Sequence, residues 1–252
     1  MTEKLIPRES VVYTSNSNSY ENYLKWCDEK EKVLFELISE IESNYSSLLD
    51  IGAGNGELTK NLSSKFSSIT VIEPAKKRLK ELTNNLINAN LNLFNEKFET
   101  VKLNGKFDFI LSSHSIYYLK DLEQTLKKIK GFLNEKGKFL IVIKSAEGEL
   151  QEFMDFFRKD VLNEKYGASL KVDKIVNLLK KQGFSVRIKE ADVKLTIPSI
   201  NETINLLDFF YNVSLKEISA GAIINIKSYL QTNFSKEVNF SYPQTIIVAT
   251  ID

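Results

Sequence analysis

Short apolar runs and helical stripes alternate along the first two thirds of the chain. Apolar runs bounded by polar residues and glycines are typical of buried strands. We expect strands at residues 47–51, 68–73, 91–95, 107–113 and 138–143. Between these runs apolar residues recur every three or four positions, as at Leu79, Leu82 and Leu86, which predicts amphipathic helices. The alternation predicts a mainly parallel sheet with helices on both faces.

The last third of the chain has a different pattern. A helical stripe containing Ile175 and Leu179 precedes Gly183, and glycine is typical just past a helix C-terminus. Two further strands are expected at residues 184–188 and 245–250, and the periodicity of residues 201–234 predicts two helices. The expected fold class is therefore α/β: a Rossmann-like, doubly wound, seven-stranded and mainly parallel sheet with an inserted α-helical cap.

We expect one domain spanning residues 1–252. Its parts would be an N-terminal helical lead at 1–45, a cofactor-binding core at 46–145 and the helical cap insertion at 191–240. Within the lead, residues 14–22 are rich in serine and asparagine and are expected to form a loop.

Composition and charge narrow the classes of function. The chain has 34 Lys and Arg against 33 Asp and Glu, and this net charge of +1 argues against a nucleic-acid or anionic-membrane partner. It has no apolar run near the roughly 18 residues of a membrane span, and its start lacks the apolar core of a signal peptide. With one cysteine and one histidine, neither a disulfide framework nor a metal site is expected. We expect a cytoplasmic protein.

Three glycines at alternate positions follow the first predicted strand. The stretch LLDIGAGNGELTKNL places Gly52, Gly54 and Gly56 shortly after Asp50. Glycine lets a ligand approach the backbone, and a strand, a tight turn and a helix N-terminus together form a nucleotide-type site. A dinucleotide fingerprint requires its third glycine one position later, where Glu57 would repel a pyrophosphate. A cofactor without phosphates fits this turn better.

The turn resembles the first motif of class I S-adenosylmethionine-dependent methyltransferases, an acid two residues before G-x-G-x-G. The stretch VIEP resembles the second motif and places Glu73 at the end of the second strand, where an acid can accept hydrogen bonds from both ribose hydroxyls. The alternative is that Glu73 only caps the following helix. The resemblance implies S-adenosyl-L-methionine as cofactor and S-adenosyl-L-homocysteine as product. The cofactor-binding residues that it implies are Asp50, Gly52, Ala53, Gly54, Gly56, Glu73, Pro74, Phe98, Glu99 and Ser113.

The adenine contacts allow two interpretations. Residues 95–101 stand where this family often has a short polar loop with an acid. Glu99 could accept a hydrogen bond from the exocyclic amine, and Phe98 could pack on the purine. The alternative is a solvated loop with Phe98 in the core.

His114 directly follows the fourth predicted strand, at the sheet edge where open α/β folds bind ligands. It could contact the acceptor or act as a catalytic general base, or it could only hydrogen-bond to the backbone. Methyl transfer from a sulfonium is an in-line displacement that depends more on alignment and water exclusion than on proton transfer. Contact with acceptor or cofactor is therefore preferred over a role as base.

Three parts of the chain are similar to histamine N-methyltransferase and its relatives. They are residues 116–133, the aromatic-rich N-terminal lead and the helices before the final TIIVAT strand. The resemblance implies methylation of a ring nitrogen in a small amine. The acceptor-site residues that it implies are Tyr23, Trp26, His114, Tyr117 and Tyr118. The family has a glutamine where this chain has His114, and its acceptor-binding glutamate could match Glu29 or Glu31. For Tyr23 the alternative is core packing, because Tyr20, Tyr23 and Cys27 share one helical face.

We therefore expect an enzyme of class EC 2.1.1.-, a methyltransferase acting on a small-molecule acceptor, an amine or a ring nitrogen. One alternative is a nucleic-acid or protein methyltransferase on the same fold, which would need a basic stripe or an open site. Another is a non-catalytic module that binds S-adenosylmethionine without turnover.

Overall fold

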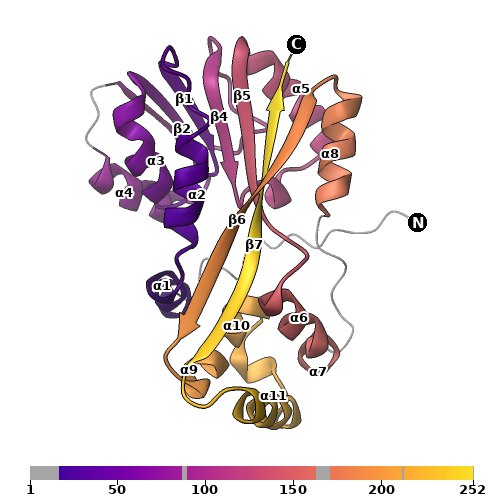
Figure 1. Ribbon diagram of the computed structural model, residues 1–252. Coiled ribbons are helices and arrows are strands. Elements are labelled where there is room, and N and C mark those ends of the chain that lie inside the picture. The colour runs from indigo at the N-terminus through magenta and orange to yellow at the C-terminus, as the bar shows by residue number, and fades with distance from the viewer. Residues whose placement is uncertain (1–16, 87–89, 163–170, 212, 252) are drawn as a thin grey trace. The chain divides into compact units, whose positions relative to one another are not determined.

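The computed structural model describes residues 17–86, 90–162, 171–211 and 213–251, which form two compact units (Figure 1). The larger unit comprises Lys30–Lys144, Leu170–Ala191 and Gln244–Asp252. The smaller unit comprises Met1–Glu29, Ser145–Ser169 and Asp192–Pro243.

The described residues form one seven-stranded sheet in the order β3-β2-β1-β4-β5-β7-β6. Its strands are β1 Ser47–Ile51, β2 Ser68–Ile72, β3 Leu91–Phe94, β4 Phe107–Ser113, β5 Leu133–Lys144, β6 Ser185–Ile197 and β7 Val238–Thr250. Strands β1 to β5 pair in parallel, and β7 is antiparallel to β5. This arrangement confirms the predicted Rossmann-like sheet.

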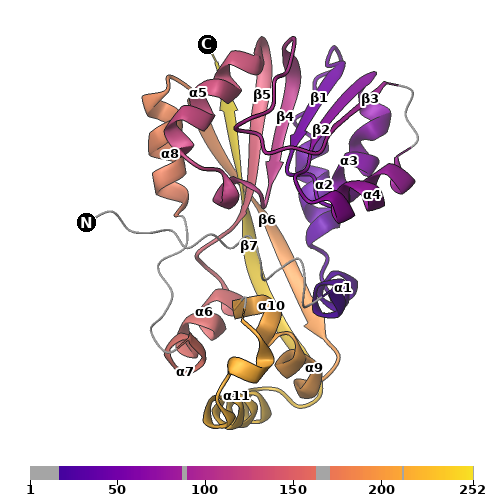
Figure 2. The same ribbon diagram turned by 180° about the vertical axis from the view of Figure 1, so that it is seen from behind.

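Helices cover both faces of the sheet in the larger unit (Figures 1 and 2). They are α2 Glu29–Ile38, α3 Glu57–Leu62, α4 Lys76–Asn85, α5 Leu122–Phe132 and α8 Val172–Lys181, with 3₁₀ turns η1 Ser63–Lys65 and η2 Ile116–Tyr118. Because neighbouring strand residues point to opposite faces, Leu48 packs with Leu37 of α2 whereas Leu49 packs with Ile129 of α5. Strand β1 is therefore buried on both sides, which explains why it reads as a continuous apolar run.

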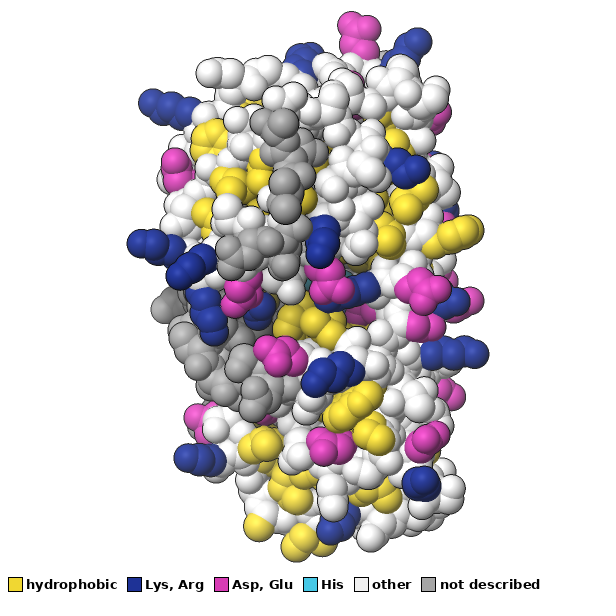
Figure 3. All heavy atoms as spheres, turned by 90° about the vertical axis from the view of Figure 1, so that its left-hand side faces the viewer, with side chains coloured by type: hydrophobic (Ala, Val, Ile, Leu, Met, Phe, Trp, Pro, Cys, Tyr) yellow, Lys and Arg dark blue, Asp and Glu magenta, His cyan; other side chains and the backbone are white. Residues whose placement is uncertain are grey.

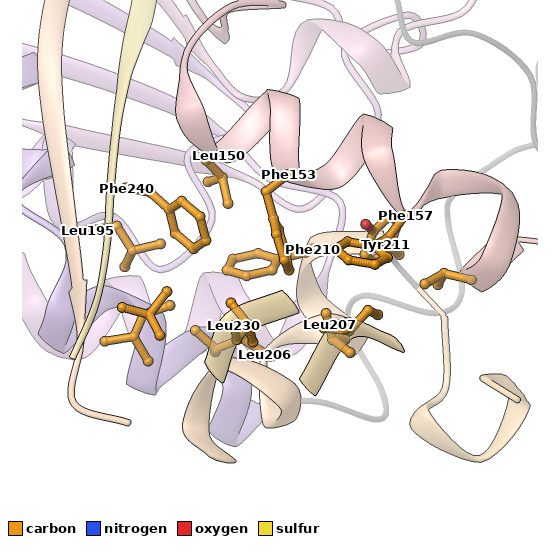
Figure 4. Packing of buried hydrophobic residues seen from close by; sticks show 14 of the residues in the cluster. Leu150, Phe153, Phe157, Leu195, Leu206, Leu207, Phe210, Tyr211, Leu230 and Phe240 are labelled. Atoms are coloured by element: carbon orange, nitrogen blue, oxygen red, sulfur yellow. The ribbon is translucent and has the colours of Figure 1, made fainter. Parts of the chain in front are cut away.

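The smaller unit is mainly helical. Its helices are α1 Ser17–Trp26, α6 Glu149–Phe156, α7 Arg158–Leu162, α9 Ile200–Asn205, α10 Leu207–Tyr211 and α11 Ala220–Asn233, with the 3₁₀ turn η3 Leu215–Glu217. Figure 4 shows Phe153 of α6, Phe240 of β7 and Leu230 of α11 within one apolar cluster. This unit therefore has a hydrophobic core of its own.

Several elements differ from the sequence prediction. Strand β5 begins at Leu133, five residues before the expected start at residue 138, and residues 200–233 form α9, α10, η3 and α11 rather than two helices. Helix α1 begins at Ser17, so residues 17–22 are not a loop; residues 14–16 lie outside the described range. Strand β6 continues to Ile197 instead of ending at residue 188, and β7 begins at Val238 rather than at residue 245. Residues 191–197 and 238–240 are thus strand where helical cap was expected. In β6 buried Val193, Leu195 and Ile197 alternate with exposed polar residues, a half-buried strand pattern that the helical interpretation missed.

Candidate functional site

The three glycines of the turn after β1 all have positive φ, at 75°, 59° and 74°. A Cβ on Gly52 would lie 2.4 Å from the Cβ of Ser115, and one on Gly56 would lie 2.4 Å from the Cγ of Leu82. A Cβ on Gly54 would meet no heavy atom of the described chain within 4 Å. The outer glycines therefore pack against the protein, and the middle one presents bare backbone to open space, as a ligand cradle requires.

Glu73, directly after β2, holds the glycine turn and the start of α4 together. Its side chain is only 3% exposed. Its Oε2 accepts a hydrogen bond from the Gly54 amide and its Oε1 accepts one from the Ala75 amide, both at 2.8 Å. The helix-start contact foreseen as the alternative is thus present, together with a contact to the turn. Each carboxylate oxygen keeps a second lone pair, so two ribose hydroxyls can still be accepted.

Asn95, at the end of β3, adds a contact that sequence reasoning missed. Its side-chain amide donates to the backbone carbonyl oxygens of Glu73, at 2.9 Å, and of Pro74, at 3.0 Å. The carbonyls that follow β2 are thereby fixed. The only sequence signal is an amide-bearing residue after an apolar run, which is too common to single out.

Asp50 lies at the carboxyl end of β1 with its side chain almost fully buried. Its Oδ2 accepts a hydrogen bond of 2.6 Å from Thr59 of α3, a partner that the sequence did not reveal. Burial raises the pKa of Asp50 to about 7; the bond from Thr59 opposes the rise and the charge of Glu73 adds to it. The predicted site thus contains two buried acids. The neighbouring Ala53 closes the turn, because its carbonyl accepts from the Gly56 amide at 3.0 Å.

Two buried serines connect the end of β4 to the glycine turn. Ser115 donates to the carbonyl oxygen of Ile51, and the hydroxyls of Ser112 and Ser115 are 2.7 Å apart. Ser113, the predicted cofactor residue between them, is partly exposed and pairs with Val142 of β5. The bonds from Ser112 and Ser115 explain why Ser115 packs tightly against Gly52.

His114 follows β4 in the left-handed region, with φ of 49°. Its amide donates to the carbonyl oxygen of Val142 at 2.9 Å and its side chain is partly exposed. Positive φ is uncommon for residues other than glycine and is concentrated at functional sites. The Tyr117 hydroxyl accepts from the Lys144 amide at 3.0 Å, and the ring of Tyr118 stands perpendicular to that of Tyr117. Contact between these side chains and an acceptor stays a prediction.

Phe98 packs in the core of the larger unit and is 2% exposed. The Nζ of Lys128 lies 4.8 Å from its ring centroid, and Phe132 contacts it edge-on. These contacts are those expected for the core-packing alternative, and contact between Phe98 and a purine stays a prediction. Glu99 is partly exposed and accepts from the Lys120 amide at 2.7 Å, so its predicted adenine contact stays open.

Tyr23 and Trp26 belong to α1 of the smaller unit. Tyr23 is buried, its ring lies 4.7 Å from that of Phe209, and its hydroxyl hydrogen-bonds to Glu29 and Tyr242. These contacts are those expected for the core-packing alternative, whereas Trp26 is partly exposed. The predicted acceptor residues thus fall in both units, and their sharing of one pocket remains a prediction.

Two classes of feature are not found among the residues described. No cluster of three or more His, Cys, Asp or Glu there could hold a metal ion. In the same residues no helix is both long and apolar enough to cross a membrane.

Known proteins similar to this chain are methyltransferases. Residues 20–188, more than half of the chain, match the family of the methyltransferase domain. Histamine N-methyltransferase of Bos taurus is 26% identical over 220 residues, covering 79% of this chain and 72% of the relative. A malonyl-[acyl-carrier protein] O-methyltransferase of Acetivibrio thermocellus is 24% identical and covers 50% of this chain and 45% of its own length.

Among solved structures, a methyltransferase of Thermotoga maritima, described as S-adenosylmethionine-dependent and a possible histamine N-methyltransferase, has a TM-score of 0.57. It is 16% identical and covers 93% of this chain and 95% of its own, a likeness that shows the fold. The open cradle at Gly54 and the two acids beside it suit the cofactor of that fold. With the family match extending over residues 20–188, the chain belongs to the class I S-adenosylmethionine-dependent methyltransferases.

Proposed function

We propose that this enzyme transfers the methyl group of S-adenosylmethionine to a nitrogen of a small amine or nitrogen heterocycle. The observation that carries the proposal is the match to bovine histamine N-methyltransferase over 79% of the chain. A likeness confined to the glycine turn and the acid after β2 would concern the cofactor alone. This match is longer, so it includes segments outside the cofactor core.

Surface charge supports a small acceptor over a nucleic acid. On the face shown in Figure 3, Lys and Arg side chains are interspersed with Asp and Glu side chains. Nucleic-acid binding relies on many lysine and arginine contacts to phosphates, and the net charge of +1 does not favour them. The residues SSHS at the end of β4 also lack the proline signature common in amino-methyltransferases of RNA and DNA.

The residues of the glycine turn would hold the cofactor. The bare backbone at Gly54 would face the ligand, Glu73 would accept from the ribose hydroxyls, and Asp50 would orient the amino-acid end through backbone or water. When bound, S-adenosylmethionine supplies a methyl group on a positively charged sulfur. The role of this chain is then to align the acceptor and exclude water, which are the main sources of rate for such a displacement.

A methyl-transfer assay tests the proposal. Purified protein would first be titrated with S-adenosylmethionine and S-adenosylhomocysteine by calorimetry, and then assayed with small amines, imidazoles, phenols, carboxylic acids and RNA. We expect cofactor binding and turnover of an amine or imidazole. Turnover of only RNA or a carboxylic acid would contradict the proposal, and binding without turnover on any acceptor would support a non-catalytic module.

Replacing His114 with alanine is expected to lower kcat/KM for the acceptor about tenfold, as the loss of one well-placed contact would. Cofactor affinity should stay within about twofold, because the hydrogen bonds to Glu73 and to the Ala53 carbonyl hold the glycine turn. Calorimetry and steady-state kinetics measure the two effects. If His114 is a general base, the variant also loses the acid limb of its pH–rate profile. Loss of cofactor binding in a folded variant would show that this placement is wrong.

Gly54→Ala and Gly56→Ala form a matched pair that tests the cradle. Both glycines have positive φ, so each alanine should cost about 1 kcal/mol of stability. At Gly56 the contact with Leu82 should raise the cost to about 2 kcal/mol. At Gly54 the methyl group would enter the open space, so cofactor affinity should fall about tenfold. Denaturant unfolding and calorimetry check both variants, and full cofactor affinity in Gly54→Ala would contradict the cradle.

A further inference from the structure

The smaller unit contains a buried carboxylate without a counter-ion. Asp208 of α10 is 6% exposed, and its Oδ2 accepts a hydrogen bond of 3.1 Å from Ser19 of α1. Its Oδ1 is buried and has no hydrogen-bond partner in the described structure. Within the described ranges no Lys, Arg or His lies within ion-pair distance of it.

Other acids of this chain show what a satisfied carboxylate looks like here. Buried Glu40 forms ion pairs with Lys138, Arg187 and Lys189. Asp108 accepts hydrogen bonds on both oxygens, including one of 2.6 Å from Asn134, and its pKa is lowered by these bonds. Asp208 differs from both, since burial raises its pKa and the hydrogen bond from Ser19 opposes this rise.

An unpaired buried carboxylate is costly and is normally neutralised by a proton or a cation. A purely structural residue at this position would gain from being apolar. A binding site for a cation requires an acid with one free oxygen, since the ligand then supplies the missing donor.

Aromatic residues follow both partners of the Ser19–Asp208 hydrogen bond along their helices. Tyr20 follows Ser19, Phe209 follows Asp208, and the two ring centroids are 5.7 Å apart. The ring centroids of Phe209 and Tyr23 are also 4.7 Å apart, so three rings lie where α1 packs against α10. Tyr20 and Phe209 are partly exposed. Ring faces attract organic cations and also cover their apolar parts.

We propose that Asp208, Tyr20 and Phe209 form a binding site for an aromatic or alkyl ammonium group, which donates to Oδ1 of Asp208. This inference rests on the proposed function, because it makes Asp208 the residue that selects a cationic acceptor over a neutral one. The apolar body of the ligand packs on Tyr20 and Phe209.

The test compares a cation with its neutral analogue. 2-Phenylethylamine, which is protonated at pH 7.5, and 2-phenylethanol would be titrated into the full chain by calorimetry or NMR. We expect the amine to bind more tightly than the alcohol. Asp208→Asn should weaken binding of the amine about tenfold or more and leave binding of the alcohol unchanged. Asp192→Asn is the matched control, because it removes an exposed charge from the same unit and should change neither affinity.

A second variant keeps the test valid if Asp208→Asn does not fold. Phe209→Leu retains an apolar side chain but removes the ring, so it should weaken binding of the amine more than binding of the alcohol. Equal affinity for amine and alcohol in the unaltered protein would overturn the proposal, as expected if a buried water satisfies Oδ1. Amine affinity unchanged in Asp208→Asn would overturn it as well.

Turnover separates the failure of this site from the failure of the proposed function. If amines are methylated with unchanged KM by Asp208→Asn, the ammonium site is wrong and the amine methyltransferase stands. If the amine binds through Asp208 but no amine or imidazole is methylated, the site stands and the proposed function is wrong.

Discussion

Replacing Glu73 with alanine is expected to weaken S-adenosylmethionine binding about a hundredfold, or a few kcal/mol. Two losses combine in this variant. The ribose hydroxyls lose their charged acceptor, and a hydrogen bond to a charged group is worth about 1.5–3 kcal/mol. The Gly54 amide loses the carboxylate that holds it at 2.8 Å, so the turn itself becomes less ordered.

A cofactor analogue separates these two losses. An S-adenosylhomocysteine analogue without the ribose 2′-hydroxyl should bind the unaltered protein more weakly than S-adenosylhomocysteine does. Glu73→Ala should bind the analogue and S-adenosylhomocysteine with equal affinity. Such non-additivity identifies a direct contact. Glu96→Ala, which removes an exposed acid shortly after β3, is the control and should bind the cofactor normally. Undiminished affinity in Glu73→Ala would refute the ribose role, and simple additivity would leave Glu73 only its role in holding the turn.

The sequence predicted the cofactor half of the fold well because the physical constraints there are local. Strands β1 and β4 have the predicted bounds, since a strand buried on both faces must be continuously apolar. Positive φ at Gly52, Gly54 and Gly56 follows from the one residue type that adopts it freely. The position of Glu73 beside that turn was predictable because it directly follows β2, the strand next to β1.

Features that depend on distant partners were not predictable. Thr59 could not be identified as the partner of Asp50, because a hydroxyl on a short helix resembles any solvated residue. The burial of Phe98 beside Lys128 depends in the same way on residues distant in sequence, and its contact with a purine stays a prediction. Nothing in the sequence marks Asp208, because the missing partner of its Oδ1 is visible only in the folded structure.

Asp50→Asn is expected to stabilise the cofactor-free protein more at pH 8 than at pH 5. Its unfolding free energy relative to that of the unaltered protein should be about 3 kcal/mol higher at pH 8 than at pH 5. The pKa of Asp50 is raised from 3.8 to about 7 by burial, with Thr59 opposing and Glu73 adding to the rise. Between these two values the native protein holds a proton that the unfolded chain releases. The free energy of unfolding therefore falls as pH rises, by about 1.4 kcal/mol per unit up to about pH 7, and asparagine removes this loss.

Urea unfolding of both proteins at pH 5 and pH 8, without cofactor, measures this difference. The gap in unfolding free energy should widen toward pH 8, whereas exposed Asp192→Asn should show a constant gap. A constant gap for Asp50→Asn would mean that Asp50 is already ionised at pH 5. The positively charged S-adenosylmethionine, bound at the glycine turn, favours the ionised form of Asp50. The affinity of the unaltered protein for S-adenosylmethionine should therefore rise from pH 5 to pH 8. This rise should be smaller in Asp50→Asn, because asparagine has no proton to release, whereas Glu73, whose pKa burial also raises, is still present.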